Sequence, residues 1–127
     1  MFAIRPTTKA DCEAFYGKAL PYRIKAYTGV IDGEVVAIGG LGFPPDGPAI
    51  GFADLKDIAR QWPYAVELHR FARRVIAEAK AAGVPRIVAK ADTSIEAAAR
   101  WLERLGFEPP NGEGTLFIWR QRHSSQS

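Results

Sequence analysis

The dipeptide Asp32-Gly33 limits the possible folds of this chain more than any other feature. It lies between two runs, 23–31 and 34–43, that are rich in β-branched and aromatic residues. Asp-Gly is a preferred dipeptide of the two-residue turns that join antiparallel strands. The sequence therefore predicts a β-hairpin, with neighbouring strands on either side of residues 32–33.

Further strands extend this hairpin. Residues 44–48, Pro-Pro-Asp-Gly-Pro, favour a turn that returns the chain into another strand beginning near Ala49. Residues 2–7 and 86–91 have the composition of short strands. Residues 115–120 are apolar on both faces, which predicts a strand that is covered on both sides.

Helix signals separate these strands. Thr8, followed three residues later by Asp11, predicts a capped helix that runs to about Tyr16. From about Pro63 the apolar period becomes 3.6, and this helix ends at Gly83. Its expected buried stripe is Leu68, Phe71, Ala72, Val75, Ala79 and Ala82. A capping box at 93–96 opens a last helix, with a stripe of Ile95, Ala98, Ala99, Leu102 and Leu105, that closes at Gly106.

Composition limits the size and the compartment. The chain has 127 residues, of which 47% are hydrophobic and 24% charged, and this profile is typical of one globular domain. We expect the domain to cover residues 1–120 and residues 121–127 to form a flexible tail. The single cysteine, Cys12, excludes an internal disulfide and a cysteine-rich zinc site, so we expect a small packing residue, a reducing cytoplasmic compartment and no metal site.

Charge and hydropathy exclude further classes. The chain does not start with a basic segment followed by an apolar run, and no stretch approaches about 18 consecutive apolar residues, so we expect neither export nor a membrane-spanning segment, and no membrane partner. The formal net charge of +3 is a mild excess that suits a small anionic ligand. Nucleic-acid binding through the arginines of the long helix is disfavoured, because few aromatic residues lie between them.

The segment 97–108, Ala-Ala-Ala-Arg-Trp-Leu-Glu-Arg-Leu-Gly-Phe-Glu, resembles the last helix of the GNAT superfamily of N-acyltransferases and its Gly-Phe-Glu step into the next strand. Residues 4–7 and 32–40 resemble the first strand and the hairpin of that family, and the resemblance covers about residues 2–120. It implies a GNAT-like fold of the mixed α/β (α+β) class. Such a fold has a mostly antiparallel sheet of six to seven strands with helices on both faces. The resemblance also implies transfer of an acetyl or similar acyl group from acetyl-coenzyme A to an amine by direct attack, without a covalent enzyme intermediate.

The cofactor loop of this family has the form Arg-x-x-Gly-x-Gly, and its backbone N–H groups hold the coenzyme A pyrophosphate. It aligns with residues 63–68, Pro-Tyr-Ala-Val-Glu-Leu, which contain neither glycine nor arginine. A helix start still offers unpaired N–H groups, whereas Glu67 brings a carboxylate to the same positive end. The residues expected to bind the cofactor are Tyr64, Ala65, Val66, His69 and Arg70.

Several of these residues have a second interpretation. Arg70, with Arg73 and Arg74, either reaches the cofactor phosphates or pairs with Glu67 and Glu78 on the helix surface. His69 suggests a base because it titrates near neutrality, but its place beside the apolar stripe favours a partly buried helix histidine. Trp62 and Tyr64 are candidates for the wall of a cleft, and Trp101 and Trp119 for the core.

The candidate catalytic residues are Asp54 and Asp92. Many GNAT enzymes place a carboxylate that deprotonates the amine on or just after the fourth strand, where Asp54 and Asp57 lie, and the alternative is an exposed acid. Asp92 follows the fifth strand and either orders the substrate or only favours the helix start. The tyrosine that many members use as the general acid aligns with Leu102, and their asparagine with Ile95, so two chemical groups of the family are replaced.

Two functions follow from these observations. The first is an N-acetyltransferase that acts on an unknown small-molecule or protein amine, as a monomer or homodimer. The second is a non-catalytic binding module of the same fold, such as a phage virion or host-interaction protein. The short chain, Gly39-Gly40 and the basic helix with Leu-His-Arg-Phe-Ala-Arg-Arg at 68–74 resemble a divergent phage and prophage subgroup of the family. That resemblance implies a phage-encoded protein of the host cytoplasm or the virion.

Overall fold

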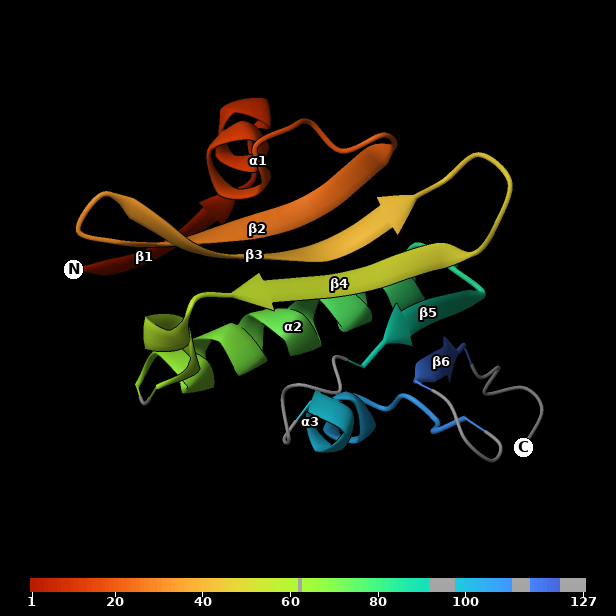
Figure 1. The fold of residues 1–127 in the computed structure, drawn as a ribbon. Helices are drawn as coiled ribbons and strands as arrows, with labels where there is room; N and C mark the ends of the chain where they lie inside the picture. The colour runs from red at the N-terminus through yellow and green to blue at the C-terminus, as the bar shows by residue number, and fades with distance from the viewer. Residues whose placement is uncertain (62, 92–97, 111–114, 122–127) are drawn as a thin grey trace.

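The computed structural model describes residues 1–61, 63–91, 98–110 and 115–121 (Figure 1). The strands and the α-helices follow one another along the chain in the order that the sequence predicts. The elements are β1 (Phe2–Pro6), α1 (Lys9–Tyr16), β2 (Arg23–Ile31), β3 (Glu34–Phe43), β4 (Ala49–Leu55), the 3-10 helix η1 (Asp57–Arg60), α2 (Tyr64–Ala81), β5 (Arg86–Lys90), α3 (Ala98–Arg104) and β6 (Leu116–Arg120).

The described strands form one six-stranded sheet in the order β1-β2-β3-β4-β5-β6. Every neighbouring pair is antiparallel except β4 and β5, which are parallel. Asp32 and Gly33 both have positive φ, 48° and 85°, as a tight two-residue hairpin turn requires. The predicted hairpin and the mixed, mostly antiparallel sheet are therefore confirmed.

Helices cover both faces of the sheet. Figure 1 shows α1 on one face and α2 with α3 on the other. The main core lies between the sheet and the helices α2 and α3. Its buried residues are Leu41, Ala49, Val75, Ala79, Ile87, Ala89, Ala91, Leu102, Phe107, Phe117 and Trp119.

A polar cluster fixes α1 to the sheet. Thr8 caps α1, and Asp11 returns the capping-box hydrogen bond to the Thr8 backbone. The same Asp11 carboxylate accepts two hydrogen bonds from Arg5, at 2.6 and 2.8 Å, and a third from Thr28. Burial alone would raise the pKa of Asp11, but these hydrogen bonds outweigh it and lower the pKa to about 2. Cys12 packs beside this cluster with 3% of its surface exposed, as expected.

Three predictions need correction. Ala82 is exposed, because α2 ends at Ala81 and the chain then turns through Gly83. In β6, Phe117 and Trp119 face the core but Leu116 is 50% exposed, so the strand is fully covered on one face only. Trp101 is half-buried, unlike the core residue Trp119.

Some predictions fall on other parts of the chain. The capping box at 93–96, Ile95, the turn at 112–114 and the tail from 122 to 127 lie outside the described residues. Gln121, which the sequence assigns to the tail, donates hydrogen bonds from its backbone to Pro85 and from its side chain to Val84, each at 2.9 Å.

Candidate active site

The parallel strands β4 and β5 pair over only part of their length. Ala49, Ile50 and Gly51 face Ile87, Val88 and Ala89. Beyond Gly51, β4 continues to Leu55 and pairs with β3, but along this stretch its other edge has no partner among the described strands. The sheet therefore has a break in its pairing beside the C-terminal half of β4.

Asp54 lies on this half of β4. The strand register places it in one cross-strand row with Ile38 and Thr28, and Thr28 contacts Asp11 of α1. Directly opposed residues share a face of the sheet, so Asp54 lies on the α1 face. Its side chain is exposed, and the hydroxyl of Tyr16 donates a hydrogen bond to its Oδ2 at 2.6 Å. The sequence could not decide the face of Asp54, and the structure does.

Tyr16 is held at the end of α1. Gly17 follows it with φ of 79°, which ends the helix, and Phe15 packs against its ring with centroids 5.1 Å apart. Burial, the hydrogen bond to Asp54 and the charge of that carboxylate all raise the pKa of Tyr16. Tyr16 therefore stays protonated at neutral pH and acts as a hydrogen-bond donor to Asp54.

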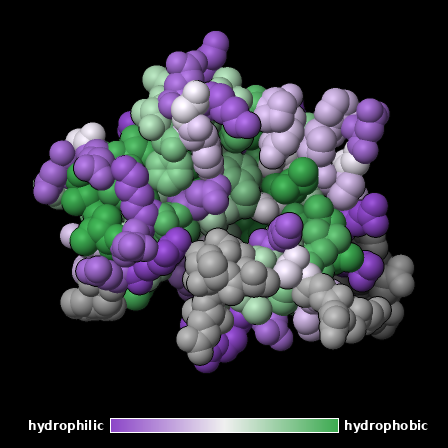
Figure 2. Space-filling model, in the orientation of Figure 1, coloured by the Kyte–Doolittle hydropathy of each residue, from purple (hydrophilic) through white to green (hydrophobic). Residues whose placement is uncertain are grey.

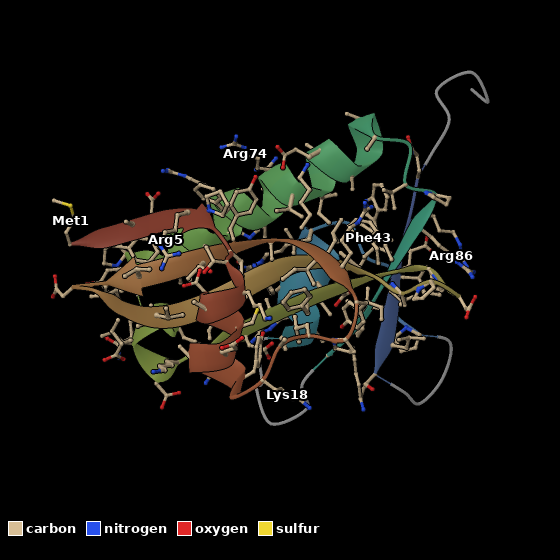
Figure 3. All side chains as sticks on the ribbon, turned by 90° about the horizontal axis from the view of Figure 1, so that it is seen from above. Met1, Arg5, Lys18, Phe43, Arg74 and Arg86 are labelled. Carbon is tan, nitrogen blue, oxygen red and sulfur yellow. The ribbon has the colours of Figure 1, made fainter. Side chains whose placement is uncertain are left out.

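An apolar surface lies beside Asp54 on the same face. The register aligns Ile24, Gly42, Ile50, Val88 and Ile118 in one row across β2 to β6. Phe52 lies between this row and Asp54 on β4. Figure 3, which looks onto this face, shows α1 over the first strands and no described helix over β5 and β6. We call the half-buried residues Ile50, Phe52, Val88 and Ile118 the apolar floor.

Tyr22 borders the apolar floor. A Cβ atom at Gly42 would lie 2.2 Å from Cε2 of Tyr22, so the ring rests directly on the glycine backbone. Seen in the orientation of Figure 1, hydrophobic residues (green) reach the molecular surface between hydrophilic ones (purple) (Figure 2). The sequence does not indicate that Tyr16 and Tyr22 belong to the site, because no local spacing links them to Asp54, which lies on another element.

The start of α2 differs from a glycine-rich phosphate loop. Pro63 is the N-cap and has no backbone N–H, while the N–H of Ala65 donates to the carbonyl of Gln61 at 2.9 Å. The Tyr64 ring packs on Phe2, with centroids 5.1 Å apart, and Val66 is 41% exposed. Glu67 pairs with Arg70 at 3.3 Å, so Arg70 has the helix-surface partner that the sequence offered as its second interpretation.

His69 joins α2 to α3. The indole N–H of Trp101 donates to its Nδ1 at 2.9 Å, so this nitrogen is unprotonated in the structure. Burial lowers the pKa of His69, and the positive charges of Arg73 and Arg104 lower it further. The structure thus supports the partly buried helix histidine rather than a free base. It also places the two arginines close to the junction of the helices.

The remaining candidates are dispersed. Asp57 lies in η1 and pairs with Arg60 at 2.8 Å, and Arg74 lies 3.8 Å from Glu78. Leu102 is buried in the core. Asp92 and Trp62 lie outside the described residues. Among the described candidates, Asp54 is therefore the one at the break in the sheet.

Comparison with known proteins defines the fold. No protein-family model and no curated protein matches the sequence. Solved structures do match: the ribosomal-protein-S18-alanine N-acetyltransferase from Escherichia coli has a TM-score of 0.67 at 18% identity, over 98% of this chain and 96% of that one. An N-acetyltransferase from Staphylococcus aureus Mu50 has a TM-score of 0.62 at 19% identity, over 93% and 94%. A GNAT-family acetyltransferase from Streptococcus pneumoniae has a TM-score of 0.64 at 11% identity, over 96% and 100%.

These similarities show that the chain has the fold of the GNAT acetyltransferases, as the resemblance implied. The identities lie below 20%, so the likeness concerns the fold and leaves the reaction to the site itself. Within the described ranges, no helix is long and apolar enough to cross a membrane.

Proposed function

We propose that this protein is an acyl-coenzyme A-dependent N-acyltransferase, with Asp54 as the base that accepts a proton from the amine. The observation that carries the proposal is the position of Asp54. In this GNAT fold, Asp54 lies on the half of β4 that does not pair with β5. The hydroxyl of Tyr16 donates a hydrogen bond to its Oδ2 at 2.6 Å. The reaction is direct attack of the amine on the acyl thioester.

The chemistry needs a carboxylate that is accessible and oriented. An amine attacks only after it loses its proton, so a nearby acceptor raises the fraction of reactive nucleophile. Asp54 is exposed and can receive that proton directly or through water. Tyr16 donates to one carboxylate oxygen and so restrains the side chain, which leaves the second oxygen for the amine. Asp54 is thus a catalytic residue, and Tyr16 is a positioning residue.

The pantetheine end of coenzyme A would bind along the outer edge of β4. The outer edge of β4 between Phe52 and Leu55 offers backbone groups for the amides of an extended ligand, because no described strand pairs with it. Coenzyme A supplies the acyl group as a thioester when it is bound. Another structure of this fold, a mutant AtaT toxin bound to acetyl-CoA and to the C-terminus of the antitoxin AtaR, has a TM-score of 0.53 at 12% identity.

The phosphate end of coenzyme A requires a different arrangement from the family loop. Pro63 lacks an N–H group, that of Ala65 is engaged with Gln61, and Glu67 adds negative charge. Arg73 and Arg104, which lie near His69, supply positive charge between α2 and α3. We therefore expect these two arginine side chains to bind the phosphates, together with the residues that the sequence predicts for the cofactor: Tyr64, Ala65, Val66, His69 and Arg70.

Calorimetric titration with acetyl-coenzyme A tests the proposal. We expect micromolar binding, and Ala65→Glu should weaken it at least tenfold because it adds bulk and charge at the start of α2. Ala77→Glu adds the same charge to an exposed position farther along α2 and is the matched control. No heat up to millimolar ligand, with an unchanged melting temperature, would exclude the enzyme.

The replaced groups of the family favour one alternative function. Leu102, which aligns with the tyrosine acid, is buried and has no proton to donate, and the start of α2 lacks glycine. A non-catalytic module with the GNAT fold would show these changes. Binding of acetyl-coenzyme A without acetylation of any amine in a broad panel would support this alternative.

A further inference from the structure

We propose that the apolar floor and Asp54 form the binding site of the acceptor, and that the acceptor is a primary amine with one positive charge on an apolar or aromatic body. This inference rests on the proposed function and names its substrate class. Three features carry it: the carboxylate at one end, the length of the apolar surface, and the charges around that surface.

The charged end is suited to an ammonium group. Asp54 is exposed and accepts a hydrogen bond from Tyr16, so it can also accept one from a bound ammonium. The phenol ring of Tyr16 lies beside this carboxylate, and aromatic faces attract cations. Lys56, two residues farther on, lies 3.3 Å from Glu34 and over the ring of Phe15, so it has partners other than Asp54.

The apolar floor sets the size of the body. From Asp54 it continues through Phe52 to Ile50 and crosses to Val88 and Ile118. Four residues of a strand span about 13 Å, which is the length of a medium alkyl chain or an arylalkyl group. The floor residues are half-buried rather than sealed, so a ligand can remove further apolar area from water.

The charges around the floor disfavour polyamines. Lys90 shares the face of Val88 and is exposed, which adds a positive charge beside the floor. Glu108 lies 3.8 Å from Arg120, so its charge is already partnered at the far edge of the sheet. A second ammonium on the acceptor would therefore meet a lysine, or an acid that already has an arginine partner. The arrangement selects one charge and an apolar remainder.

An alkylamine series tests this inference. The full chain is titrated with ethylamine, butylamine, hexylamine and octylamine without cofactor, and acetylation of the same amines is measured with acetyl-coenzyme A. We expect affinity and kcat/KM to rise about two- to threefold per methylene until the floor is covered. The affinity and kcat/KM for 2-phenylethylamine should be at least tenfold higher than those for ethylamine. Spermidine should have the lowest kcat/KM of all these amines.

Variants locate the site. Val88→Thr changes the floor with nearly constant volume and should reduce the gain per methylene for the longer amines. Val35→Thr makes the same change at a half-buried position beside the hairpin turn and should leave that gain unchanged. Asp54→Asn should weaken amine binding at least tenfold, whereas Asp57→Asn should not.

The outcomes separate the two proposals. Equal use of ethylamine and octylamine, or preference for spermidine, would overturn the acceptor class while acetylation upholds the enzyme. Chain-length-dependent binding that Asp54→Asn abolishes, without acetylation of any amine, would uphold this amine site and overturn the enzyme. If octylamine is acetylated but Val88→Thr leaves the gain in kcat/KM per methylene unchanged across the amine series, the assignment of the acceptor site to the apolar floor is wrong.

Discussion

Asp11 provides the sharpest test of how this fold is stabilised. Its carboxylate is 5% exposed and accepts hydrogen bonds from Arg5, the Thr8 backbone and Thr28. These bonds join β1, the start of α1 and β2, which are separate in sequence. Replacement by asparagine keeps the shape and one acceptor oxygen, but it removes the charge. We expect Asp11→Asn to destabilise the protein at neutral pH.

The magnitude follows from the pKa. Folding lowers the pKa of Asp11 from an ordinary value of 3.8 to about 2. Each pKa unit corresponds to about 1.4 kcal/mol, so the charged form contributes roughly 2.4 kcal/mol to the free energy of unfolding. Because the folded-state pKa is the lower one, this stabilisation is complete above about pH 4 to 5 and is lost as the pH falls through 2.

Urea unfolding followed by tryptophan fluorescence measures this effect. At pH 7 we expect Asp11→Asn to lower the free energy of unfolding by about 2 kcal/mol, and the difference from the wild type should shrink between pH 5 and pH 2. Asp46→Asn removes an exposed acid in the turn after β3 and should have little effect. A difference between Asp11→Asn and the wild type that stays constant from pH 7 to pH 2 would refute the reasoning.

Four further predictions concern the site and the core. Asp54→Asn should lower kcat of the proposed reaction by about 10²- to 10⁴-fold in steady-state kinetics, and it should leave the protein folded because this strand position is exposed. Tyr16→Phe should lower kcat several-fold in the same assay and leave the KM for acetyl-coenzyme A unchanged. Gly40→Ala should lower the free energy of unfolding in urea by about 1–3 kcal/mol, because a Cβ there would lie 2.3 Å from the Lys25 carbonyl oxygen. Gly47→Ala should have little effect, because the nearest atom to a Cβ there, Cγ of Pro44, would be 4.0 Å away. His69 accepts the Trp101 hydrogen bond at Nδ1, so a proton on that nitrogen would break the bond. Because burial and the nearby arginines lower the pKa of His69 in the folded state, the stability that Trp101→Phe removes should be present above about pH 6.5 and fade as the pH falls below it, as measured in thermal melts at graded pH.

Most of the secondary structure can be predicted from local signals in the amino-acid sequence. Asp32-Gly33 defined the hairpin because only a few dipeptides adopt two successive positive φ angles easily, and both residues have them. Thr8 and Asp11 defined the start of α1 through the capping box. These signals are local, since they depend on residues a few positions apart. The ends of α2 and the exposure of Leu116 were less predictable, because they depend on what lies across from each residue.

The candidate site, by contrast, depends on contacts between residues that are far apart in the sequence. Tyr16 and Asp54 are 38 residues apart, and their hydrogen bond exists because α1 lies over the face of the sheet to which Asp54 belongs. The alternation along β4 alone allowed either face, and the cross-strand register resolved it. His69 is a second example. Its ability to titrate near neutrality suggests a base, but its Nδ1 accepts a hydrogen bond from the indole of Trp101 in α3. Local propensity thus specifies the elements, whereas the chemical role of a side chain depends on partners that only long-range packing brings to it.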